Sequence, residues 1–551
     1  MLSTLTKPEP DKNTASALFP LRRDREFWLV LGSLTAVYLI AIFFDGQRFV
    51  WFDELCTFDI ARAGSLRQLW QWVLAFDNNP PTVYLLSRFS MWILGPTPLG
   101  LRLPSMLEFY FGSVAMLVYI RRKANIAVGA FAVAILWSSA SFYYAVEARV
   151  YALVFLSFAC LLLSWDSAIK SSDRRLALWC AGISTLVLLQ SHVFGSLCLF
   201  AFVIAELVRY LRRRKPDYPL YLALGLPMLT MLLYIPLIRV YKGLILWPQF
   251  HASPIMAAKF YYRAFDTIAR AMFVVALAAM VLLPFSKGPS VTKAKYAREE
   301  WALYACMLFN PLLLNLLLMQ RRGDFFDRYT LTANVVLYGI LAVLYAVQLR
   351  FNRTFAYAAT LVMVLLLAHG VRRDWLKRPR QLDPNTFRSL RPDLPIVVSN
   401  GATWVEMNHH ETPEVVARLW YVKDRAAAIK YDGTNYYYDF EALDDMKRAG
   451  FPFAGNVEPY PEFIKEHRVF LIYADPYEWL ALRLQQDGAS FTLMRGFTNA
   501  PRANQIPLAQ PTDPISDASG SAPHISYPTP FVSEGSPYIA SHIYLVTMPT
   551  K

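Results

Sequence analysis

The chain has 551 residues, of which 55% are hydrophobic, and a formal net charge of +14 at pH 7. Its mean hydropathy of +0.29 excludes an ordinary soluble protein of this size. The basic residues stand in short stretches between apolar runs, which is typical of membrane topology control and not of a nucleic-acid-binding surface. The five cysteines form no CxxC pair, so no disulfide framework is expected.

A polar, basic tail, residues 1–26, precedes the first apolar run at Phe27–Phe44. This run is long enough to cross a bilayer and lacks a small-residue cleavage site, so it predicts a signal anchor that stays in the protein. The chain then enters a first outer loop, residues 45–100, which begins with the acidic pair Asp53-Glu54. This pair is the first candidate for chemistry, because a carboxylate there can accept a proton or hold a metal.

The same loop contains two helical patterns. Gly64–Phe76 carries apolar residues at helical spacing after a serine that can cap the helix, with polar residues on the other side. It is too short and too polar to span, which predicts a helix lying in the membrane surface. Thr82–Leu94 follows Pro80-Pro81 and predicts a second helix, half-buried beside the bundle.

Apolar length predicts about eleven spans within residues 27–370. They are Phe27–Phe44, Leu103–Ile120, Asn125–Tyr144, Tyr151–Trp165, Leu176–Gln190, Val193–Leu211, Pro219–Tyr241, Thr267–Phe285, Trp301–Met319, Tyr329–Leu349 and Thr354–Gly370. With the amino terminus inside, the inner loops are all rich in Lys or Arg, as the positive-inside rule requires. The outer loop Gln320–Arg328 is also basic, and binding of an anionic group would explain it.

Residues 371–551 have a soluble composition, and the odd number of spans places them outside the membrane. Leu394–Ser399, Ala427–Tyr431, Arg468–Ala474, Phe491–Arg495 and Ser541–Met548 predict strands, while Phe440–Ala449 and Tyr477–Leu484 predict helices. The alternation favours a small extracytoplasmic α/β domain, with a Pro/Ser-rich loop near residues 507–537. His409-His410-Glu411 is expected to be a solvated loop and not a zinc site, because three consecutive ligands rarely close a tetrahedron.

Polar residues at the outer ends of the spans should converge above one face of the bundle. They are Asp53, Glu54, Asp77, Asn78, Asn79, Arg102, Glu147, Arg149, Tyr151, His192, Arg321, Arg322, Arg328 and Tyr329. Glu108 lies inside a span, where a carboxylate is costly unless paired. Arg102 or Arg149 is therefore expected to neutralise it.

Six segments occur in an order and spacing that resemble a known family. They are WFDE, NNPPTVYLLSR, LRLPS, YYAVEARVYAL, SHVFG and DRYTL, between residues 51 and 331. Together they resemble the polyprenyl-phosphate-sugar-dependent glycosyltransferases of the GT-C class, most closely the bacterial members related to protein O-mannosyltransferases and the lipid A aminoarabinose transferase. The chain departs from the family in having Asn78-Asn79 where relatives often have His, and in Glu108.

The resemblance implies an α-helical polytopic membrane protein of GT-C type in the bacterial cytoplasmic (inner) membrane. Its donor would be a polyprenyl-phosphate-linked sugar, its acceptor a hydroxyl of a lipid, glycan or protein, and the sugar carbon would be inverted. Asp53 holds the family's position for the general base, with Glu54 as support or, together with Asp53, as ligand of a divalent cation (Mg²⁺ or Mn²⁺). Arg321, Arg322 and Arg328 would neutralise the phosphate, since guanidinium forks match phosphate geometry, and Tyr329 would add a hydrogen bond.

Two other functions compete with this hypothesis. A lipid or glycolipid flippase or transporter would be expected to show internal repeats and helices broken near mid-membrane, and the sequence shows no repeat. A non-catalytic scaffold that only binds polyprenyl phosphate is the third hypothesis, against which the intact acidic pair argues.

Overall fold

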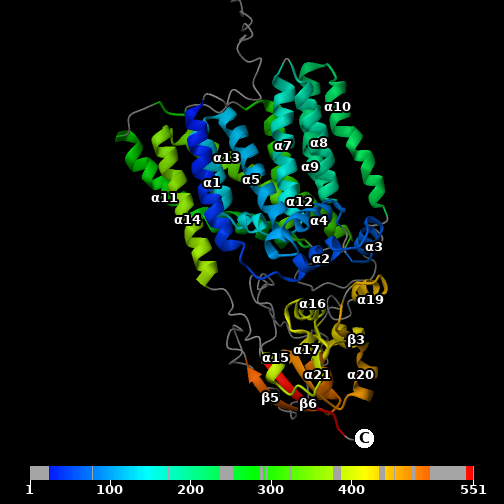
Figure 1. The fold of residues 1–551 in the computed structure, drawn as a ribbon. Helices are drawn as coiled ribbons and strands as arrows, with labels where there is room; N and C mark the ends of the chain where they lie inside the picture. Colours follow the sequence, from blue (N-terminus) through cyan, green and yellow to red (C-terminus); the bar gives the residue numbers. More distant parts are fainter. Residues whose placement is uncertain are drawn as a thin grey trace, which may run out of the picture.

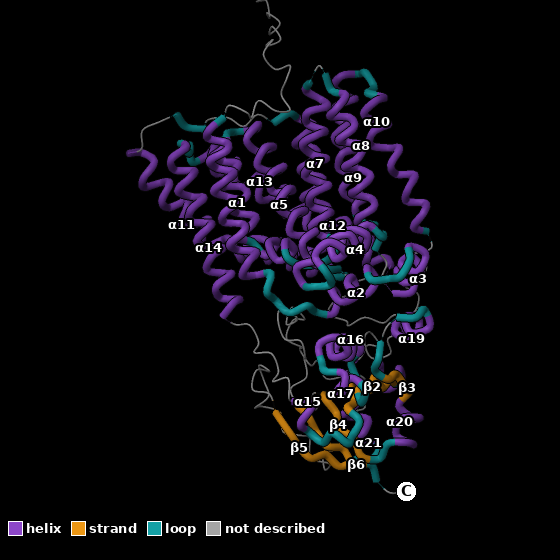
Figure 2. The backbone as a smooth tube through the Cα atoms, in the orientation of Figure 1, coloured by secondary structure: helices purple, strands orange, loops and turns teal. Residues whose placement is uncertain are grey.

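The chain folds into a large helical bundle followed by a small α/β domain, as the fold-class prediction expects (Figure 1). The computed structural model describes residues 24–76, 79–171, 173–235, 252–285, 289–291, 296–321, 325–376, 386–432, 441–451, 453–474, 478–496 and 542–549. Figure 2 shows the strands confined to the lower unit, while the upper unit is helical. The Pro/Ser-rich loop near residues 507–537 lies outside the described residues.

The main helices of the bundle run side by side (Figure 1). They are α1 (Arg25–Asp45), α5 (Pro98–Lys123), α6 (Ile126–Ser138), α7 (Tyr151–Lys170), α8 (Arg175–Ser191), α9 (Gly195–Arg213), α10 (Tyr218–Gly225), α11 (Pro254–Leu282), α12 (Arg298–Arg321), α13 (Leu331–Gln348) and α14 (Arg353–Leu376). Among the described residues, six helices are long and apolar enough to cross a membrane, or seven if one bent pair is a single span.

The expected number of spans is therefore larger than the number of full-length apolar helices. Each expected span falls on a helical stretch, apart from the end of Pro219–Tyr241, which lies outside the described residues. Several of these stretches are short or broken, which explains the difference. α6 ends at Ser138 and continues as the 3-10 turn η2 (Ala140–Ala145), and α10 continues as the 3-10 helix η3 (Leu226–Tyr234).

The centre and the outside of the bundle are both apolar. All thirteen residues of α6 are buried, as expected for a helix that is hydrophobic all round and packed among other helices. Large apolar side chains such as Trp28, Trp179 and Phe273 are more than half exposed on the outer helices. Such a surface suits a lipid environment, where apolar side chains need no cover.

Three short helices lie across the lower end of the bundle, facing the α/β domain (Figure 1). They are α2 (Phe52–Ala61), α3 (Leu66–Phe76) and α4 (Thr82–Leu94). The two helices predicted for the first outer loop are thereby confirmed as α3 and α4. The predicted cap is also present, because the Gln68 N–H donates to the Ser65 hydroxyl over 3.1 Å.

The α/β domain is built on a six-stranded sheet with the order β3-β2-β1-β4-β6-β5. Its strands are β1 (Ile396–Val398), β2 (Leu419–Lys423), β3 (Asn456–Pro459), β4 (Val469–Ala474), β5 (Ser490–Gly496) and β6 (His542–Thr547). The first four in this order are parallel, and β6 pairs antiparallel with β4 and β5. The helices of this domain are α15 (Thr386–Ser389), which precedes β1, and α16 (Gly401–His410), α17 (Pro413–Val416), α18 (Arg425–Asp432), α19 (Glu441–Arg448), α20 (Tyr460–Glu466) and α21 (Trp479–Gln486), which lie between the strands along the chain.

Most predicted elements of this domain are confirmed, and one is wrong. The strand expected at Ala427–Tyr431 is part of helix α18. Asp424 starts that helix, since its side chain accepts a hydrogen bond from the Ala427 N–H over 3.0 Å. An Asp cap followed by a run of alanines favours a helix over a strand. Strands β2 and β3 were not expected from the sequence.

Candidate active site

The acidic pair stands in the first turn of α2, the helix that the chain forms after leaving α1. All ten residues of α2 are buried, although the helix is too short to span a membrane. Neighbouring residues on a helix point about 100° apart, so Asp53 and Glu54 face different surroundings. The structure gives each carboxylate a different arginine.

Glu54 is held on both of its oxygens by Arg102 of α5. The Arg102 Nε donates to Oε1 over 2.7 Å and Nη2 donates to Oε2 over 2.5 Å, and both residues are 1% exposed. The Ala148 N–H also donates to Oε1 over 2.9 Å. Arg102 further donates to the carbonyls of Gly46, Arg48 and Phe49. This pair ties α2 to α5 and to the end of α1, and it gives Glu54 a supporting position beside Asp53.

Asp53 faces two arginines that come from distant parts of the chain. Its Oδ2 lies 3.1 Å from Nη1 of Arg328 and 4.0 Å from Nε of Arg149. Arg149 also donates to the Asp53 backbone carbonyl over 3.2 Å. Arg328 stands in the 3-10 turn η7 (Asp327–Thr330) before α13, and Arg149 in the loop before α7. Two guanidinium groups beside one carboxylate leave an excess of positive charge that suits an incoming anion.

Glu147 lies in the same loop as Arg149 and is 2% exposed. Its Oε2 has no hydrogen-bond partner in the part of the chain that the structure describes. Burial raises the pKa of Glu147 to about 8; the Arg328 charge opposes the rise, and the carboxylates of Asp53 and Glu54 add to it. Glu147 is therefore mostly protonated at neutral pH, and the positive charge around Asp53 is not cancelled by it.

Aromatic rings line the side of this site that faces the start of α7. The His192 ring centroid lies 6.1 Å from that of Tyr151, 5.1 Å from that of Phe194 and 5.4 Å from that of Tyr329. The Phe194 N–H donates to Nδ1 of His192 over 3.1 Å, which places the proton of the neutral imidazole on Nε2. The Arg328 guanidinium lies 5.8 Å from the Tyr151 ring centre, so the aromatic wall and the cationic pair are continuous.

The structure thus gathers most of the residues expected at the site. Asp53, Glu147, Arg149, Tyr151, His192, Arg328 and Tyr329 converge, and Glu54 and Arg102 support them. Asn79 is buried at the start of the segment that leads to α4. Asp77, Asn78 and Arg322 lie outside the described residues, as does the side chain of Arg321.

Two expectations about individual residues are wrong. Arg102 does not neutralise Glu108, because its guanidinium is committed to Glu54, and no ion pair joins Glu108 to any described residue. His409 and His410 do not form a solvated loop but end helix α16. The His410 Nε2–H donates to the Val50 carbonyl over 2.9 Å, and His409 packs edge-on against Phe58 with centroids 4.9 Å apart.

One further residue beside the acidic pair could not be predicted from the sequence. The Phe52 N–H donates to Oε1 of Glu406 over 2.8 Å, across 354 residues of chain. Glu406 belongs to α16 of the C-terminal domain and is 6% exposed. Nothing in the local sequence around it marks a contact with the first outer loop, because such contacts arise only when the two domains pack.

A divalent cation does not fit the carboxylates present. Both oxygens of Glu54 are taken by Arg102, and Asp53 is flanked by two further guanidinium groups. No group of three His, Cys, Asp or Glu side chains that could hold a metal occurs within the described residues. We therefore derive no catalytic step from a metal.

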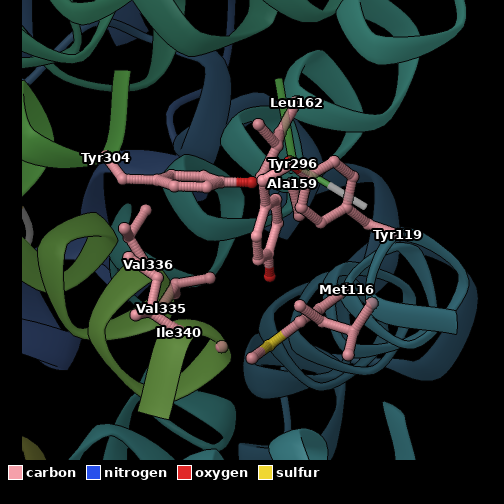
Figure 3. A pocket seen from close by; sticks show the side chains of 11 residues that line it. Met116, Tyr119, Ala159, Leu162, Tyr296, Tyr304, Val335, Val336 and Ile340 are labelled. Atoms are coloured by element: carbon pink, nitrogen blue, oxygen red, sulfur yellow. The ribbon is translucent and has the colours of Figure 1, made fainter. Parts of the chain in front are cut away.

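A second buried polar cluster lies about 32 Å along α5 from Arg102, at 1.5 Å per residue. There Lys123 donates to Oδ1 of Asp166 over 2.6 Å and also contacts Glu300, which accepts from the Tyr119 hydroxyl over 2.9 Å. Beside it, Tyr119, Tyr296 and Tyr304 line a cavity of about 20 Å³ (Figure 3), roughly the size that holds one water. The cluster joins α5, α7 and α12. Its cavity is too small to hold a substrate, and the cluster lies too far from Asp53 to belong to the catalytic site.

Comparison with known proteins yields a structural similarity only. No family model matches the chain, and no curated relative matches it. The fold is similar to the crystal structure of ArnT from Cupriavidus metallidurans in the apo state, with 14% identity, a TM-score of 0.49, and coverage of 83% of this chain and 94% of that one. The structure of the same protein bound to undecaprenyl phosphate gives 13% identity, a TM-score of 0.49, and coverage of 86% and 97%.

Proposed function

We propose that this chain is a membrane glycosyltransferase that moves a sugar from a polyprenyl-phosphate donor to an acceptor hydroxyl on the extracytoplasmic face. The observation that carries the proposal is the contact between Asp53 and Arg328, with Arg149 beside it. In this contact a carboxylate that could act as a base lies within a few ångströms of guanidinium groups that could bind a phosphate. The motif resemblance from residue 51 to residue 331 supports the same assignment.

The chemistry follows from what each side chain can do. Asp53 accepts the proton of the acceptor hydroxyl, whose oxygen attacks the sugar carbon bonded to phosphate. The bond from that carbon to the phosphate oxygen breaks, and its electron pair leaves with the phosphate. Arg328 and Arg149 stabilise the charge on the leaving phosphate. Attack from the side opposite to the phosphate inverts the sugar carbon.

The donor has a direct effect on the contact between Asp53 and Arg328. The Arg328 Nη1 atom donates to Oδ2 of Asp53 over 3.1 Å. The donor's phosphodiester carries one negative charge, as the carboxylate does, and its two unesterified oxygens match the guanidinium fork, so it competes for Arg328. Donor binding would thereby release Oδ2 of Asp53 to accept the acceptor hydroxyl.

The surrounding structure favours a lipid-linked donor. Arg328 starts the apolar segment that continues as α13, one of the helices able to span a membrane. A phosphate at Arg328 therefore lies at the end of a membrane helix, where a polyprenyl tail can extend along the bundle. The helices α3 and α4 lie beside α2, which suits an acceptor presented at the membrane surface.

Mass spectrometry of cellular glycans and glycolipids tests this proposal. We compare cells that carry the intact protein, cells without it, and cells that carry the Asp53→Asn variant at equal membrane abundance. The proposal requires one sugar modification that is present with the intact protein and absent in the other two. Identical glycan and glycolipid profiles in all three would contradict it and would favour a transporter or a binding scaffold.

The divalent cation is tested separately. Because the carboxylates do not fit a metal, we expect sugar transfer by the purified protein to continue in the presence of EDTA. Loss of transfer on chelation, with recovery on adding Mg²⁺ or Mn²⁺, would restore the metal role for Asp53 and Glu54.

A further inference from the structure

The first turn of α2 is held from outside by the C-terminal domain. Trp51 is the residue before the helix, and its side chain makes no capping hydrogen bond. The capping acceptor comes instead from Glu406, whose Oε1 accepts from the Phe52 N–H over 2.8 Å. A carboxylate at this place satisfies an N–H that the helix itself leaves unpaired.

A second side chain of α16, that of His410, contacts the backbone on the other side of Trp51. The His410 Nε2–H donates to the Val50 carbonyl over 2.9 Å, and the rings of His410 and Phe49 lie 3.9 Å apart. Glu406 and His410 are four residues apart on α16, so they project from one face of that helix. We call these two side chains the α16 clamp; it fixes the backbone on both sides of Trp51.

We propose that the α16 clamp positions Asp53, so that the C-terminal domain holds the general base in its catalytic orientation. Asp53 directly follows the clamped residue Phe52, and any change in where α2 begins moves its carboxylate relative to Arg328. The inference rests on the proposed function, since it gives the C-terminal domain a part in the same reaction. Glu406 is in this account a positioning residue that touches neither donor nor acceptor.

The electrostatic setting indicates which substitution should be tolerated. Glu406 is buried, which raises its pKa well above the usual range for a carboxyl group; the Phe52 N–H opposes the rise, and the Asp53 charge adds to it. In the structure, Oε1 of Glu406 acts as the hydrogen-bond acceptor of the Phe52 N–H. A glutamine offers the same acceptor oxygen at almost the same place, whereas an alanine offers none.

Four variants of the full-length protein in lipid nanodiscs test the inference. Glu406→Ala removes the acceptor, and Glu406→Gln keeps it. Glu414→Gln removes an exposed carboxylate on α17 of the same domain. Trp72→Phe removes a different contact between the domains, the hydrogen bond from Trp72 Nε1 to the Ala449 carbonyl.

We expect Glu406→Ala to lower kcat by up to about 100-fold, because a small misplacement of a catalytic group can cost that much. Donor affinity should change little, since Arg328 and Arg149 are untouched. Glu406→Gln should keep most of the turnover, and Glu414→Gln and Trp72→Phe should be close to the unaltered protein. Wild-type kcat in Glu406→Ala, or an equal loss of kcat in Trp72→Phe, would overturn the inference, the second because any loosening of the domain would then suffice.

Hydrogen exchange of backbone amides tests the α16 clamp without measuring sugar transfer, so a failure of the clamp can be told apart from a failure of the proposed function. The backbone amides of residues 52–54 should exchange faster in Glu406→Ala than in Glu414→Gln, whether or not the protein transfers sugar. If the unaltered protein transfers no sugar but this exchange result holds, the proposed function fails and the clamp remains. Unchanged exchange in Glu406→Ala would rule out the clamp itself.

Discussion

Arg328 and Asp53 form an ion pair at 3.1 Å although 275 residues separate them along the chain. One comes from the first outer loop and the other from the turn before α13. Their contact therefore reports that the two halves of the bundle meet at one site. Whether this site binds a lipid phosphate and activates a hydroxyl can be tested residue by residue.

The first prediction concerns Arg328 as a phosphate ligand. Arg328→Ala should weaken binding of a polyprenyl phosphate by about 10- to 150-fold, because a hydrogen bond to a charged group contributes about 1.5–3 kcal/mol. Arg328→Lys should recover only part of the affinity, since a planar fork becomes a point charge. The measurement is equilibrium binding of polyprenyl phosphate to the purified variants. Arg353→Ala, at an exposed position on α14, is the control, and equal affinity for Arg328→Ala and this control would contradict the assignment.

The second prediction follows from the protonation of Glu147. Its pKa of about 8 means that the folded protein holds a proton there which the unfolded chain loses above about pH 4.5. Stability from this group is therefore full below pH 4.5 and falls as the pH rises towards 8. Above pH 8 the new charge also cancels part of the positive charge near Asp53.

Affinity for polyprenyl phosphate should accordingly fall between about pH 7 and pH 9. Glu147→Gln mimics the protonated acid, so its affinity should be nearly independent of pH over this range. Binding measured at several pH values for both proteins checks the prediction. The same fall in both would show that another group is responsible.

The third prediction concerns the buried ion pair between Arg102 and Glu54, which we expect to stabilise the fold. Arg102→Met leaves the Glu54 carboxylate buried without its main partner, which typically costs about 3–5 kcal/mol of stability. Arg353→Met breaks an exposed pair with Glu26 and should cost no more than about 1 kcal/mol. Thermal unfolding of both variants in the same nanodiscs makes the comparison. Similar melting temperatures for the two would mean that the buried pair does not hold α2 in place.

Sequence reasoning found the parts of this site that have local signals. The pair Asp53-Glu54, the segment Glu147–Arg149 and the segment Asp327–Tyr329 could be recognised because each stands at the outer end of an apolar run. The different roles of Asp53 and Glu54 could not be predicted, because they depend on which arginine each carboxylate contacts across the bundle. The contact of Glu406 with α2 could not be predicted for the same reason, because it forms only between distant parts of the chain. The strand expected at residues 427–431 is wrong because the prediction followed the apolar residues of this stretch. The local signal that decides the structure is the Asp424 cap, which starts a helix.

The fourth prediction concerns membrane topology. The alternation of basic loops places the amino terminus in the cytoplasm and the domain after residue 370 on the outer face. Reporter fusions after residue 215 and after residue 380 should therefore report opposite sides of the membrane. Signals from the same side would change the number of spans between them and the compartment assigned to the site.

The central claim is that Asp53 is the general base, and Asp53→Asn tests it most directly. Asparagine keeps the size and the hydrogen bonding of the side chain but removes its basicity. Turnover of a polyprenyl-phosphate sugar by the purified variant should fall by about 10²–10⁴-fold, the usual contribution of general-base catalysis, while its affinity for polyprenyl phosphate persists. Turnover close to that of the unaltered protein would contradict the account and leave Asp53 as a partner of Arg328 without a part in the reaction.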